Sequence, residues 1–137
     1  MMTTPTPVPS SAGRAVAPRS RAVLVVDDDR DIRETLQEVL ELEGYEVATA
    51  RNGLEALARM RAARPAIVLL DLFMPVMDGI EFRRRQLEEV ELADVPVVVV
   101  SAAAGIEERI AALGVEGHLE KPLRIERLFE VVERFCH

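Results

Sequence analysis

The sequence AVLVVDDD at residues 22–29 sets a run of five apolar residues directly before three aspartates. An apolar run of this length matches a buried strand and is too short to cross a bilayer. Two further runs, AIVLLD at 66–71 and VVVVS at 97–101, end on a polar residue in the same way. Strands that are apolar on both faces are typical of a parallel sheet that helices cover on both sides.

Segments with apolar residues at helical spacing separate these predicted strands. Gly44 is placed to end the first helix, Asn52 to cap the second, and the third is expected over about residues 80–91. Predicted strands at 45–50 and 115–119 bring the pattern to five strands that alternate with five helices. This order predicts an α/β fold with a doubly wound parallel sheet.

The composition narrows the class of protein. The 137 residues include 24 acidic and 17 basic side chains, a net charge of −7, which argues against binding nucleic acid through a basic surface. Cys136 is the one cysteine, so an internal disulfide is excluded and a reducing compartment is favoured. The N-terminus lacks the apolar stretch of a secretory signal. We therefore expect a cytoplasmic protein that does not insert into a membrane.

The chain is expected to divide into a tail and one domain. Residues 1–21 are rich in Pro, Ser, Thr and Ala, lack apolar periodicity, and are predicted to be disordered. Residues 22–137 are predicted to form the folded domain. Within this domain, the three consecutive arginines at 83–85 are expected to lie on a solvated helix face.

Polar residues gather at the predicted carboxyl ends of the strands, the edge at which doubly wound sheets bind ligands. They are Asp27 and Asp28 after the first strand, Asp71 after the third, Ser101 at the fourth, and Lys121 after the fifth. Clustered carboxylates need a cation, and hard oxygen ligands in an open crevice favour Mg²⁺. A carboxylate beside the metal can attack phosphorus, while a lysine and a hydroxyl hold the phosphoryl oxygens.

These motifs resemble the receiver domain of two-component response regulators. The resemblance rests on VVDDD at 25–29, LLDLFMPVMDG at 69–79, VVVVSA at 97–102 and EKP at 120–122, and it covers about residues 22–136. It implies a flavodoxin-like sheet of strand order 2-1-3-4-5. It also implies a switch that promotes only its own phosphorylation and dephosphorylation and is not otherwise an enzyme.

The resemblance assigns roles to individual residues. Asp71 is the implied phosphoacceptor. The carboxylates of Asp27, Asp28 and Asp71, with the backbone carbonyl of Phe73, are the implied ligands of Mg²⁺. Ser101 and Lys121 are expected to bond the phosphoryl oxygens. Pro122, which follows Lys121, corresponds to a proline with a cis peptide bond.

Two positions depart from the family pattern. His118 stands where receivers usually carry Tyr or Phe, and we expect it to act with Ser101 as the rotamer switch, with packing that depends on pH. Phe73 and Ala103 stand at two positions that influence how water reaches the acyl phosphate. Neither side chain can orient a water molecule, so slow autodephosphorylation is predicted.

Two other interpretations of the aspartates are excluded, each by a single residue. Asp27, Asp29 and Asp31 imitate the start of a calcium-binding loop, but Ile32 stands where that loop needs glycine. Asp29 is instead expected to cap the following helix. A haloacid-dehalogenase-type phosphatase would need a second aspartate where Phe73 stands.

The sequence thus predicts a single-domain response regulator that takes its phosphoryl group from a sensor histidine kinase or a histidine phosphotransfer protein. No DNA-binding segment follows the domain, so output is expected through contact with an unidentified protein target, with a weak homodimer as a further option. Two alternatives stay open. The domain can instead be a phosphorelay shuttle or phosphate sink, or a pseudo-receiver scaffold that works without phosphorylation.

Overall fold

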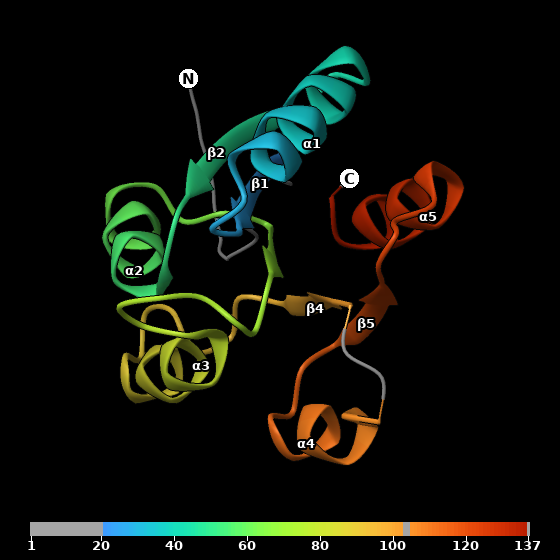
Figure 1. Ribbon diagram of the computed structural model, residues 1–137. Coiled ribbons are helices and arrows are strands. Elements are labelled where there is room, and N and C mark those ends of the chain that lie inside the picture. Colours follow the sequence, from blue (N-terminus) through green and yellow to red (C-terminus); the bar gives the residue numbers. More distant parts are fainter. Residues whose placement is uncertain (1–20, 103–104, 137) are drawn as a thin grey trace, which may run out of the picture.

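The computed structural model describes residues 21–102 and 105–136, which form a five-stranded parallel sheet flanked by helices (Figure 1). The strand order is β2-β1-β3-β4-β5, which confirms the predicted doubly wound, flavodoxin-like topology. The strands are β1 (Ala22–Val26), β2 (Glu46–Ala50), β3 (Ile67–Leu70), β4 (Val97–Ser101) and β5 (Gly117–Glu120). The predicted disorder of residues 1–21 falls, up to residue 20, outside the described residues.

Five helices alternate with the strands, as predicted. They are α1 (Arg30–Leu42), α2 (Gly53–Ala62), α3 (Gly79–Glu88), α4 (Glu107–Ala112) and α5 (Ile125–Phe135). Asp29 caps α1 by accepting from the backbone N–H groups of Asp31 and Ile32, and Asn52 caps α2 by accepting from that of Glu55. Both caps were predicted from the sequence. None of the helices in the described part of the chain is long and apolar enough to cross a membrane.

The two faces of the sheet carry separate apolar cores, because successive strand residues point to opposite sides. On one face, Val23 and Val25 of β1 pack with buried residues of α1 and α5. On the other face, Leu24 and Val26 pack with buried residues of α2, α3 and α4. Burial on both faces explains why these strands lack an alternating sequence.

Two predicted boundaries differ from the structure by more than one residue. Helix α3 ends at Glu88, and the chain then turns, because the buried side chain of Gln86 donates to the backbone carbonyls of Leu92 and Val95 at 2.8 and 3.0 Å. Strand β5 begins at Gly117 and not at residue 115, and Gly114, which ends the preceding turn, takes a positive φ of 65°.

The prediction that the arginines at residues 83–85 are solvated is wrong for Arg83. Arg84 and Arg85 are exposed and pair with Glu81, but Arg83 is only 5% exposed. Its guanidinium donates to the backbone carbonyls of Leu113 and Gly114 at 3.0 and 2.7 Å, just beyond α4. Arg83 therefore ties α3 to the C-terminal end of α4.

Candidate functional site

The polar residues singled out from the sequence lie where parallel strands of one sheet end together. Asp27 directly follows β1, Asp71 directly follows β3, and Ser101 is the last residue of β4. Strand β2 lies on one side of β1, whereas β3, β4 and β5 follow one another on the other side. The winding direction of the sheet therefore reverses between β1 and β3. Such a crevice is the usual binding place in doubly wound sheets.

Three aspartates converge in this crevice. Asp27, Asp28 and Asp71 each place one carboxylate oxygen within 4.8 Å of the others. Asp27 and Asp71 are 3% and 7% exposed, whereas Asp28 faces solvent. Carboxylate oxygens are the donors that Mg²⁺ prefers, and an open position towards solvent suits an ion that keeps several of its waters. The donor set therefore fits Mg²⁺.

Lys121 adds a cation to this group of carboxylates. Its Nζ donates to Oδ2 of Asp27 at 2.9 Å and lies 3.8 Å from Oδ2 of Asp71. The backbone N–H of Lys121 donates to the carbonyl of Ser101 at 3.0 Å, which fixes the segment after β5 against the end of β4. The peptide bond between Lys121 and Pro122 is cis, in agreement with the resemblance.

Burial raises the pKa of Asp71 to about 6. The Phe73 backbone N–H, which donates to Oδ1 of Asp71 at 3.2 Å, lowers the pKa, and the Lys121 ammonium acts in the same direction. The negative charges of Asp27 and Asp28 act in the opposite direction and raise it. Asp71 is therefore ionised at neutral pH but only weakly stabilised in that form, which is a suitable state for a nucleophile.

The two predicted switch residues occupy neighbouring strands. Ser101 is buried at the end of β4, and His118 is half-buried on β5, where it pairs with Val99. The Nε2 atom of His118 is buried and has no hydrogen-bond partner among the described residues. A buried polar atom without a partner costs about 1–3 kcal/mol, so this ring position is not a strongly favoured one.

Phe73 lies two residues after Asp71 but is not packed into the core, since 48% of its surface is exposed. Ala103, the other residue from which we predicted a slow loss of the phosphoryl group, lies outside the described residues. The predicted role of the Phe73 carbonyl in metal binding stays a prediction.

Two further residues position the site and were not found from the sequence. Arg33 of α1 donates from Nη1 to the backbone carbonyl of Asp27 at 2.9 Å and so fixes the loop that carries Asp27 and Asp28. At Gly79, a Cβ atom would lie 2.7 Å from the backbone carbonyl oxygen of Asp71. The glycine that ends LLDLFMPVMDG could have indicated that the backbones of Gly79 and Asp71 approach closely. No sequence pattern around Arg33 indicated that it contacts Asp27.

Comparison with known proteins agrees with this geometry. Residues 23–133 match the family model described as the response regulator receiver domain. This chain belongs to that family. Receiver domains are signalling switches that bind Mg²⁺ at an acidic pocket and interact with histidine kinases and downstream targets. The acidic group found here is compatible with that metal.

Individual relatives show the same similarity. The polar-differentiation response regulator DivK of Brucella anthropi is 34% identical over 117 residues, which are 84% of this chain and 95% of DivK. Response regulator MprA of Mycobacterium avium is 40% identical over 108 residues, and the match spans 77% of this chain but only 46% of MprA. The chemotaxis protein CheY4 of Vibrio cholerae has a similar structure, with a TM-score of 0.78, 33% identity, and coverage of 87% of this chain and 100% of CheY4.

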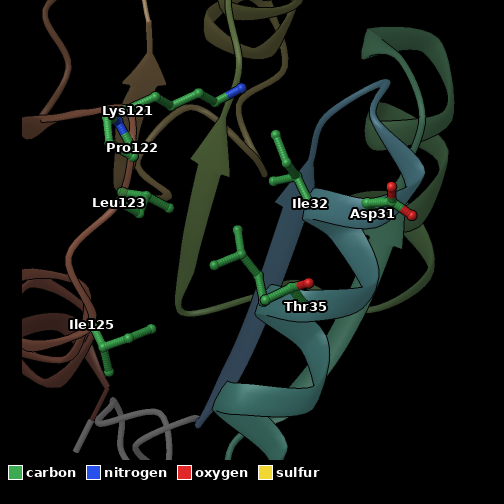
Figure 2. Close-up of a pocket in the computed structure, with 8 residues that line it drawn as sticks. Asp31, Ile32, Thr35, Lys121, Pro122, Leu123 and Ile125 are labelled. Carbon is green, nitrogen blue, oxygen red and sulfur yellow. The ribbon is translucent and has the colours of Figure 1, made fainter.

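An apolar groove of about 350 Å³ opens beside the receiver site, between α1 and the segment that follows β5. Figure 2 shows Ile32 and Thr35 of α1 facing Leu123 and Ile125 across this groove. Lys121, which contacts Asp27 and Asp71, also lines the groove. A protein surface placed in the groove would thus lie next to the site.

Proposed function

We propose that this receiver domain accepts a phosphoryl group on Asp71 from a phosphohistidine and signals through protein contacts that depend on phosphorylation. The observation that carries this proposal is the position of the Asp71 carboxyl group. It is buried beside Asp27 and Asp28 and 3.8 Å from the Lys121 ammonium. A carboxylate with a purely structural role is usually stabilised in its charged form by a close ion pair. The surroundings of Asp71 instead raise its pKa to about 6.

The chemistry follows from these groups. An oxygen of the Asp71 carboxylate attacks phosphorus, the bond from phosphorus to the imidazole nitrogen of the donor breaks, and an acyl phosphate forms. Lys121 and Ser101 hold the phosphoryl oxygens. Asp27, Asp28, Asp71 and the Phe73 carbonyl would hold Mg²⁺, which offsets the charge of about −1.5 to −2 that the phosphoryl group brings.

The groove between α1 and the segment after β5 supports docking of the donor. Its wall includes Ile32 and Leu36 from α1 and Leu123 and Ile125 from the other side. A donor has to bring its phosphohistidine close to Asp71, and burial of apolar surface beside the site provides the affinity for this step. A sensor histidine kinase or a histidine phosphotransfer protein with an apolar helix face fits this requirement.

Phosphorylation with acetyl phosphate, followed by intact mass measurement, tests the proposal. We expect one phosphoryl adduct on the full chain in the presence of Mg²⁺, none with a chelator, and none on Asp71→Asn. Asp94→Asn is the matched control, because Asp94 is exposed and pairs with Arg64 away from the site. An adduct that persists in Asp71→Asn, or is absent from the wild type, would contradict the proposal.

A further inference from the structure

A groove opens at the amino ends of β1 and β2, at the edge of the sheet opposite to the acidic crevice. Its volume is about 280 Å³, and its lining comes from the starts of these two strands and from the C-terminal end of α2. Ala48, Ala62 and Ala63 are exposed in it, and Glu46 and Arg59 are its two charged lining residues. This amino-end groove is therefore a mainly apolar surface that the described part of the chain leaves open.

The N-terminal segment of the chain enters the fold beside the amino-end groove. The backbone carbonyl of Arg21 accepts from the backbone N–H of Glu46 at 3.0 Å, and Ala22, the next residue, lines the groove. Residues 1–20 contain two arginines and no acidic residue, whereas all 24 acidic residues lie in residues 21–137. An extended chain covers about 3.3 Å per residue, so residues 14–18 are close enough to reach the groove. Opposite charge favours their contact with the acidic domain.

Arginines from distant segments bond to the ends of two helices in this protein. Arg21 donates to the backbone carbonyls of Glu43 and Gly44, the two residues that follow α1, at 3.0 and 3.3 Å. Arg83 donates in the same way to the carbonyls of the two residues that follow α4. The last carbonyls of a helix lack partners within the helix and carry partial negative charge, so a guanidinium group stabilises them.

The end of α2 has no bond of this kind. Within the part of the chain that the structure describes, no side chain donates to the backbone carbonyl of Ala62 or Ala63. Both residues line the amino-end groove. A guanidinium group brought to this groove would therefore find acceptors of the kind that Arg21 finds at the end of α1.

We infer that the amino-end groove binds residues 14–18 of this chain, Arg-Ala-Val-Ala-Pro, with Val16 and Pro18 against the apolar lining and Arg14 at the end of α2. Alternate side chains of an extended segment lie on one side, which groups these three residues. Pro18 favours an extended conformation at Ala17. Because the segment is joined to the domain next to the groove, its effective concentration is high and modest apolar burial suffices.

This inference goes beyond the proposed function and does not depend on it, since the groove lies at the other edge of the sheet from Asp71. It also limits the disorder predicted for the N-terminal residues to those outside 14–18.

The test uses the full chain with ¹³C-labelled alanine and valine methyl groups, studied by NMR. We expect NOEs between the methyl groups of Val16 and those of Ala48 and Ala62. Ala62→Leu fills the groove and should abolish the NOEs from Val16 in a folded protein. Ala58→Leu is the matched control, because Ala58 is exposed on the same helix outside the lining, and it should keep the NOE to Ala48.

Thermal unfolding gives a second measurement. Val16→Ser should lower the Tm by about 3 °C, because it removes apolar surface from the groove. Val8→Ser makes the same change in the same N-terminal segment, outside residues 14–18, and should lower the Tm by less than about 1 °C.

Three results would overturn the inference. The first is an absence of NOEs from Val16 to the groove. The second is that these NOEs join only labelled to unlabelled molecules in a mixed sample, which would show that the segment binds a second copy of the chain. The third is an equal Tm for Val16→Ser and Val8→Ser.

Discussion

Nζ of Lys121 lies 2.9 Å from Oδ2 of Asp27, closer than the 3.8 Å that separates it from Oδ2 of Asp71. The ammonium group is thus held by Asp27, which is not the proposed phosphoacceptor. A phosphoryl group on Asp71 would offer Lys121 a stronger anion close to its present partners. The pair with Asp27 therefore holds the lysine 3.8 Å from the proposed phosphoacceptor.

Replacement of Lys121 should raise the pKa of Asp71. Lys121→Met removes the nearby positive charge that lowers this pKa and leaves Asp27 and Asp28, which raise it. We expect the pKa of Asp71 to rise above about 6, as measured by ¹³C NMR titration of the carboxyl group without metal. Lys121→Arg keeps the charge and is the control. An unchanged pKa in Lys121→Met would contradict the described electrostatics.

Asp71→Asn should stabilise the metal-free protein in a manner that depends on pH. Because burial raises the pKa of Asp71 to about 6 from its ordinary value of 3.8, the folded state holds this proton more tightly than the unfolded state. The contribution of Asp71 to the free energy of unfolding therefore falls as pH rises from about 4 to 6, and this loss remains above pH 6.

Asp71→Asn has no carboxyl group to titrate at position 71, so its free energy of unfolding does not include this loss. We expect its Tm to exceed that of the wild type by about 5 °C at pH 8 with a chelator, and the difference to vanish below about pH 4. Thermal unfolding at several pH values measures this. Asp94→Asn should show no such divergence, and a variant that is less stable than the wild type at pH 8 would refute the prediction.

Arg83→Met should destabilise the fold. The substitution keeps an unbranched apolar side chain but removes the donors to the carbonyls of Leu113 and Gly114 and to Oε1 of Gln86. Buried acceptors without donors should lower the free energy of unfolding by about 2 kcal/mol, measured by urea denaturation. Arg84→Met, which removes only exposed pairs with Glu81 and Glu88, should cost less than about 1 kcal/mol. Similar losses in both variants would contradict the burial of Arg83.

Val76→Gly should stabilise the fold. Val76 has a φ of 69°, a left-handed conformation that a β-branched residue rarely adopts, and its side chain is 81% exposed. Glycine removes this strain without loss of packing, for an expected net gain of about 1 kcal/mol in urea denaturation. Val90→Gly is the control, because Val90 is 91% exposed and lacks a positive φ, and it should destabilise. A loss of stability in Val76→Gly would disprove the strain.

Phe73 should prolong the life of the phosphoryl group. Its backbone N–H donates to Asp71, and its exposed ring cannot orient a water molecule by hydrogen bonding. Phe73→Asn should shorten the half-life of the adduct by about ten-fold, followed by intact mass over time, whereas Phe73→Leu should change it little. Equal half-lives in the wild type and Phe73→Asn would rule out this role.

The topology and the position of the acidic crevice could be predicted because both depend on short, local patterns. Apolar runs that end on Asp27, Asp71 and Ser101 identify strand ends, and a parallel sheet necessarily gathers such ends along one edge. The caps at Asp29 and Asn52 are equally local, since each accepts from a backbone N–H two or three residues further on.

The contacts of long side chains could not be predicted in this way. Arg83 and Arg84 are neighbours in one basic run, yet Arg83 reaches backbone carbonyls 30 and 31 residues away and is buried there. Arg33 likewise contacts a carbonyl in the loop before its own helix. Helical spacing predicts the direction of each Cα–Cβ bond. The position of the guanidinium group, however, depends on hydrogen-bond acceptors that only the tertiary structure brings close.

The most direct test of the account is the location of the acyl phosphate. After treatment with acetyl phosphate and Mg²⁺, reduction with borohydride converts a phosphorylated aspartate to homoserine, which peptide mass mapping can locate. The account predicts homoserine at position 71 alone, and none when a chelator replaces Mg²⁺. Homoserine at Asp27, Asp28 or another acidic residue, or unmodified Asp71 in a fully folded sample, would contradict it.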